Sequence, residues 1–126
     1  MNYSRCRDYM LGKPEAYEGF PFGPDVSVMK VANKMFATLV GETGISSMNL
    51  KCNPDEAIML RDIFPAISPG YHMNKRHWNT IVLDASVPVG ELERMIDHSY
   101  TLVVKGLPRA GRMALEIRHG KELLYL

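Results

Sequence analysis

Apolar and polar residues alternate with a period of two through much of the first half of the chain. Val26–Val31 and Lys34–Val40 both follow this alternation, and Ile45–Cys52 repeats it. Alternation of this kind indicates half-buried strands. Only Ala32 and Asn33 separate the first two strands, which is typical of a tight hairpin turn. The pattern therefore predicts an antiparallel meander of three strands.

The clearest local signal is the run Asn53-Pro54-Asp55-Glu56, which predicts the start of a helix. The Asn53 side chain can accept hydrogen bonds from first-turn amides, and Pro54 occupies a position that needs no donor. Glu56 can reach back to the amide of Asn53 and complete a capping box. We expect this helix to end near Phe64, before Pro65, with a buried stripe of Ala57, Leu60 and Phe64.

Two further helices follow from helical periodicity and from residues that end helices. Tyr3–Leu11 has Ser4 as a candidate cap and stops at Gly12. Glu91–Lys105 is the longest predicted helix and stops at Gly106. Six residues recur at the spacing of one helix face, all of them apolar except Ser99, and they are Leu92, Met95, Ile96, Ser99, Leu102 and Val103.

The remaining segments are shorter and less regular. Glu18–Asp25 holds two prolines and two glycines and predicts a rigid loop, whose Phe20 and Phe22 either pack on the sheet, the favoured interpretation, or line a pocket. A turn at Ser68-Pro69-Gly70 precedes a strand over His77–Leu83. The basic tail 109–126 fits either a strand pair or a short helix. The fold class is α+β, an antiparallel sheet of four to five strands with three helices in α-β3-α-β-α order.

Composition and charge limit the classes of function. A chain of 126 residues, 46% hydrophobic and 23% charged, fits a single globular domain over residues 1–126, with 109–126 as a basic extension. Residues 1–70 carry seven basic and eight acidic groups (−1), and residues 71–126 carry eight and six (+2). This balance excludes a strongly cationic protein but allows a local basic patch. No signal segment or membrane-length apolar run is visible, so a cytoplasmic location without membrane contact is expected.

The stretch from Gly70 to Asn79 holds the most unusual chemistry. Lys75 and Arg76 can neutralise phosphates, Asn74 and Asn79 can add polar contacts, and Trp78 can stack on a base. The alternative, which the strand pattern favours, is that Trp78 points into the core together with Thr80 and Val82.

Nucleic-acid binding by this chain would be weak. If Lys75, Arg76, Lys51 and Lys34 each met one phosphate, affinity would fall with salt with a slope of roughly −3 to −4. Such a slope indicates salt-sensitive, largely nonspecific binding in about the micromolar range or weaker near physiological salt, unless a dimer doubles the basic surface.

No catalytic, cofactor or metal site is visible. Cys6 and Cys52 fit small buried residues, and no glycine-rich phosphate loop is present. A metal site could be built from His72 and His77 together with Cys52, His98 or His119, but the spacing of these residues along the chain matches no known zinc-binding pattern. We therefore expect a protein that is not an enzyme and that has no cofactor and no metal.

Several motifs occur in a recognisable order. They are the Pro21–Pro24 loop, a hairpin with Val28-x-Lys30-Val31-x-x-Lys34-Met35-Phe36-Ala37, the Asn53–Glu56 helix start, and His72-x-Asn74-Lys75-x-His77-Trp78-Asn79-Thr80. Over residues 3–108 the chain resembles the MmcQ/YjbR family of small bacterial proteins. It departs from the usual pattern at Pro88-Val89-Gly90, where an acidic cap is typical, and in the longer tail after Pro108.

The resemblance implies a fold similar to type III secretion chaperones and a DNA-binding label based on a double-wing shape. Our leading hypothesis is a protein that binds DNA weakly and could act in regulation. The alternative is a protein-interaction or chaperone-like module that binds no nucleic acid. The candidate DNA-contacting residues are His72, Asn74, Lys75, Arg76, Lys51 and Lys34.

Overall fold

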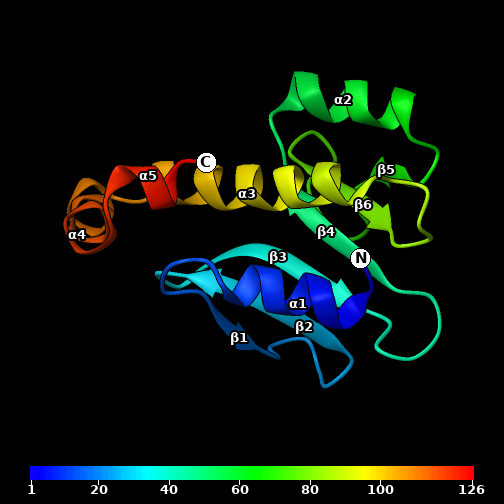
Figure 1. Cartoon of the computed structure of the whole chain (residues 1–126), viewed down its shortest axis with the longest axis horizontal. Helices are drawn as coiled ribbons and strands as arrows, with labels where there is room; N and C mark the ends of the chain where they lie inside the picture. Colours follow the sequence, from blue (N-terminus) through cyan, green and yellow to red (C-terminus); the bar gives the residue numbers. More distant parts are fainter.

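A six-stranded antiparallel sheet is the frame of the molecule in the computed structural model, which describes residues 1–126 (Figure 1). The strands lie in the order β1-β2-β3-β4-β6-β5, and every neighbouring pair is antiparallel. The α+β class is therefore confirmed. The strands are β1 (Tyr17–Gly19), β2 (Val26–Val31), β3 (Lys34–Val40), β4 (Ser47–Lys51), β5 (Ile67–Pro69) and β6 (Trp78–Val82).

The hairpin of β2 and β3 forms as its alternation predicts. Ala32 and Asn33 have φ values of 48° and 65°, the left-handed pair of a tight two-residue turn. A bulge opposite Met29 and Lys30 leaves Phe36 as an extra residue in β3. Phe36 is buried, and its ring meets the edge of Tyr100 with 5.3 Å between ring centroids. The bulge thus adds an aromatic contact between the sheet and the long helix.

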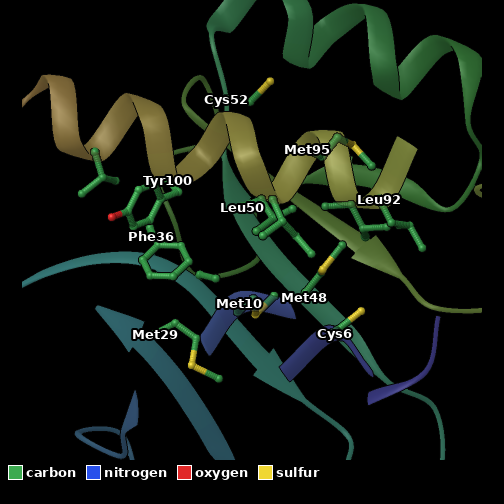
Figure 2. Close-up of a cluster of buried hydrophobic side chains, with 14 of the residues drawn as sticks. Cys6, Met10, Met29, Phe36, Met48, Leu50, Cys52, Leu92, Met95 and Tyr100 are labelled. Carbon is green, nitrogen blue, oxygen red and sulfur yellow. The ribbon is translucent and has the colours of Figure 1, made fainter. Parts of the chain in front are cut away.

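Two helices cover one face of the sheet. Side chains of α1 and α3 join inward-facing strand residues in a single hydrophobic core (Figure 2). The helix α2 packs beside β5, and α4 and α5 lie beyond one end of α3 (Figure 1). The helices are α1 (Tyr3–Leu11), α2 (Pro54–Ile63), α3 (Val89–Lys105), α4 (Arg109–His119) and α5 (Lys121–Leu124).

The helix starts differ in detail from the sequence predictions. Asn2 caps α1, because its side chain accepts from the amide of Arg5; the predicted cap Ser4 lies inside the helix. Asn53 caps α2 as predicted. Glu56 does not close a capping box, because Arg94 of α3 binds its carboxylate at 2.6 Å. An ion pair between helices has replaced the local contact.

The count of elements also differs, because six strands and five helices form. β1 and β5 lie in segments predicted as a loop and a turn. Each of these strands has three residues and lies at an edge of the sheet. It forms because one neighbouring strand supplies its backbone hydrogen bonds, and that pairing is a tertiary contact. Pro69 is compatible with such an edge position. The tail forms α4 and α5 rather than strands, and it buries Leu115 and Leu124.

Candidate functional site

A groove of about 720 Å³ lies on the sheet face opposite α1 and α3. Register places alternate residues of β2, β3, β4 and β6 on this open face, while their neighbours fill the core. The sheet side of the groove carries short aliphatic and neutral hydrogen-bonding groups and no charged side chain. These strand residues are Val26, Thr38, Val40, Ser47, Asn49, Ser68, Thr80 and Val82.

A hydrogen-bonded row crosses the floor of the groove. The Asn49 amide Nδ2 donates to Thr38 Oγ1 at 3.1 Å, and the Thr80 hydroxyl donates to Asn49 Oδ1. The Thr80 hydroxyl also accepts from the amide of Tyr71 at 2.9 Å. This row fixes the Asn49 carboxamide, whose second N–H stays available to a ligand.

Exposed rings border the groove on two sides. Phe22, in the loop between β1 and β2, is 67% exposed, and Tyr71, after β5, is 69% exposed. The Tyr71 ring lies 4.0 Å from the ring of His72, whose φ of 59° is unusual for a residue other than glycine. The pocket interpretation of Phe22 is therefore correct, and the favoured interpretation that it packs on the sheet is wrong.

The four predicted cations gather at one end of the sheet. Lys34 begins β3, Lys51 ends β4, and the loop with Lys75 and Arg76 leads into β6. Because these neighbouring strands are antiparallel, all three points lie at the same end. None of the four side chains forms an ion pair. This end therefore carries uncompensated positive charge beside the groove.

Arg61 of α2 holds the loop before β6 in place. Its Nε donates to Asn79 Oδ1 at 2.7 Å, and its Nη2 donates to the backbone oxygens of Lys75 and Trp78. Asn79 is only 2% exposed and also donates to the Ala57 carbonyl. The prediction that Asn79 contacts nucleic acid is wrong, because its carboxamide joins the sheet to α2.

The other predicted contact residues of this loop remain at the surface. His72, Lys75 and Arg76 are exposed. Asn74 is exposed too, but its side chain accepts from the amide of Arg76 at 3.0 Å and shapes the turn. His72 alone of these residues lines the groove itself.

Trp78 does not lie in the core. Alternation places it on the open face with Thr80 and Val82, and it is half-buried. Its Cβ packs against Gly70, where an added Cβ would lie 2.8 Å away. The prediction that Trp78, Thr80 and Val82 share one face is correct. The prediction that this face points into the core is wrong, because alternation does not indicate which face the helices cover.

A second cluster lies between β4, α2 and α3, away from the groove. The Cys52 thiol, a Glu56 carboxylate oxygen and a His98 ring nitrogen lie within 4.8 Å of one another. They line a cavity of about 10 Å³, which is the size of one water molecule or one ion. His72, His77 and His119 take no part in this cluster.

This cluster does not have the properties of a nucleophilic active site. Burial, with a smaller contribution from Glu56, raises the pKa of the Cys52 thiol to about 11, whereas reactive cysteines have lowered values. Burial likewise raises the pKa of the Cys6 thiol. The cavity beside Cys52 has no room for an organic substrate.

Sequence reasoning missed several groove residues. Asn49 lies outside every motif, Tyr71 directly precedes the motif from His72 to Thr80, and Thr80 ends it, so the grouping of the three in one groove depends on strand register. The available signal was the alternation of polar Asn49 and Thr80 with apolar neighbours, which marks a face that is not packed in a core.

The fold and the groove define a class of small α+β proteins with an antiparallel sheet that is covered by helices on one face and open on the other. The family model of YjbR matches residues 11–102, and the chain belongs to the YjbR family. The family resemblance seen in the sequence is thereby confirmed.

Relatives and solved structures agree with this assignment. The chain is 37% identical over 90 residues to the uncharacterized protein YbdF of Escherichia coli O157:H7, covering 71% of this chain and 74% of YbdF. It is 30% identical to YjbR of Escherichia coli K12, over 91% and 98% of the two chains.

A crystal structure of a Deinococcus radiodurans protein with a DUF419 domain matches with a TM-score of 0.83 and 35% identity, covering 89% of this chain and 86% of that one. A crystal structure of a Pseudomonas syringae protein matches with a TM-score of 0.71 and 30% identity, covering 81% of this chain and 98% of that one. None of the helices in this chain combines the length and apolar character that crossing a membrane requires.

Proposed function

We propose that this protein binds DNA weakly, with phosphates at the cationic end of the sheet and unpaired bases over the open face. The observation that carries the proposal is the position of Lys34, Lys51, Lys75 and Arg76 at one end of a sheet whose open face has a groove with exposed rings. Single-strand-binding proteins combine these two features, because cations follow the backbone and rings stack on bases without regard to sequence.

The groove chemistry favours unpaired bases over a duplex backbone. Its strand residues are uncharged, so phosphates find partners only at the cationic end. Phe22 and Tyr71 offer ring faces, and Asn49 offers an amide donor to a base edge. Each stacked base contributes about 1–3 kcal/mol, which fits weak rather than tight binding.

Fluorescence anisotropy with labelled single-stranded and duplex oligonucleotides at low salt tests the proposal. The single strand is expected to bind better, and Lys75→Ala with Arg76→Ala is expected to reduce the salt slope by about 1.4, or about 0.7 per lost phosphate contact. The matched control is Arg5→Ala with Arg109→Ala, which removes two exposed arginines that form no ion pair. Absence of binding, or equal effects of the two double variants, would refute the proposal.

A second candidate function is protein interaction, and one feature of α2 favours it. Ile58, Met59 and Ile63 are 59%, 57% and 59% exposed, so the outer side of α2 presents apolar surface to solvent. Such surface is typical of a protein-binding site. Ile58→Ser with Ile63→Ser is expected to abolish capture of one defined partner from cell extract, while the binding of oligonucleotides stays unchanged.

A further inference from the structure

Three potential metal ligands converge from three different elements. Cys52 lies between β4 and α2, Glu56 lies in the first turn of α2, and His98 lies on α3. Their donor atoms lie within 4.8 Å of one another around the cavity of about 10 Å³. The three residues do not follow a zinc-binding pattern along the sequence. They come together in space because α2 and α3 pack beside the end of β4.

The separation of His98 and Glu56 fits shared coordination better than a hydrogen bond. His98 Nε2 lies 3.5 Å from Glu56 Oε2, while N–H···O hydrogen bonds centre near about 2.9–3.0 Å. Two ligands bound tetrahedrally to zinc at about 2.0–2.2 Å lie about 3.4 Å apart. The pair therefore already has the separation that a shared zinc ion requires.

The buried ring nitrogen lacks any partner. His98 Nε2 is inaccessible to solvent and makes no hydrogen bond, whereas buried polar atoms in proteins are nearly always satisfied. A metal ion in the adjacent cavity would accept its lone pair. Its unsatisfied state is an observation independent of the three-residue cluster.

Arg94 completes the surroundings of the site. Its guanidinium binds Glu56 Oε1 at 2.6 Å and leaves Oε2 free to face His98. Ligand carboxylates in metal sites are commonly oriented in this way. Glu91 compensates the charge of Arg94, and one thiolate with one carboxylate neutralises a divalent ion. The result is a half-buried site with no net charge, in which Cys52 is buried and Glu56 and His98 are partly exposed.

We propose that Cys52, Glu56 and His98 bind one divalent zinc-class metal ion, with water as the fourth ligand. Sulfur, imidazole and a single carboxylate suit Zn²⁺ or Co²⁺, whereas Ca²⁺ and Mg²⁺ require oxygen ligands. The sequence prediction that no metal binds was based on spacing along the chain, and this proposal replaces it.

Equilibrium dialysis of the full chain against Zn²⁺, followed by metal analysis, tests the site. The wild type is expected to retain one Zn²⁺ per chain, and Cys52→Ser and His98→Gln are expected to bind at least about tenfold more weakly. Cys6→Ser is the matched control, because Cys6 is also buried but lies on α1 on the other side of the core (Figure 2). It is expected to retain the metal.

Co²⁺ titration of the wild type gives a readout that does not depend on variant folding. A sulfur-to-cobalt charge-transfer band and tetrahedral ligand-field absorption are expected. Circular dichroism checks the fold of each variant. Lack of the charge-transfer band in the wild type, or equal Zn²⁺ retention by Cys52→Ser and Cys6→Ser, would overturn the proposal.

Discussion

Arg61 stabilises the loop that carries the candidate DNA contacts, and its replacement by methionine tests this role. Arg61→Met keeps the aliphatic stem but removes the guanidinium from Asn79 Oδ1, 2.7 Å away in a side chain only 2% exposed. A buried acceptor left without a partner costs about 1–3 kcal/mol. Losing the hydrogen bonds to two backbone oxygens adds about 1 kcal/mol, so the free energy of unfolding should fall by about 2–4 kcal/mol.

Urea unfolding provides the measurement, followed by both the fluorescence of Trp78 and far-ultraviolet circular dichroism. The control is Arg76→Met, which alters an exposed arginine of the same loop that makes no side-chain hydrogen bond. We expect it to change stability by no more than about 0.5 kcal/mol. If Arg61→Met lowers the free energy of unfolding by no more than this control does, the proposed role of Arg61 is refuted.

Two further predictions concern packing and pH. Gly70→Ala should lower the free energy of unfolding, measured in urea, by about 1–3 kcal/mol, because the added Cβ would lie 2.8 Å from the Cβ of Trp78. The control is Gly111→Ala, which should not destabilise the protein because the space around Gly111 is open. The hydrogen bond from Arg7, followed by that from Ser27, holds the pKa of Glu18 below its usual value. Stability from Glu18 is therefore present above its unfolded pKa of about 4.3 and is lost as pH falls through the lower folded value. The stability gap between wild type and Glu18→Gln should narrow from about pH 7 to about pH 3, and a constant gap would contradict this.

The two proposals use different side chains, although Lys51 of the cationic end directly precedes Cys52 and lines the metal cavity. The DNA proposal depends on the open face and the cationic end of the sheet, whereas the metal site lies between β4, α2 and α3. Loss of Cys52 should therefore leave oligonucleotide binding intact if the fold persists, and loss of Lys75 and Arg76 should leave Zn²⁺ retention intact.

Local sequence signals determined much of the fold. The alternation of Val26–Val31 and Lys34–Val40 gave the observed strand bounds, and Tyr3–Leu11 forms the predicted helix. Asn53 and Pro54 start α2 as expected, because capping involves atoms only a few residues apart. The sequence also singled out the four cations that gather at one end of the sheet.

Only the tertiary structure decided which groups meet and which face stays open. Alternation grouped Trp78 with Thr80 and Val82, but the face that α1 and α3 cover depends on long-range packing. The edge strands β1 and β5 exist because a neighbouring strand supplies their hydrogen bonds. Cys52 and His98 are 46 positions apart (98 − 52), and only the packing of α3 beside α2 brings them to one cavity.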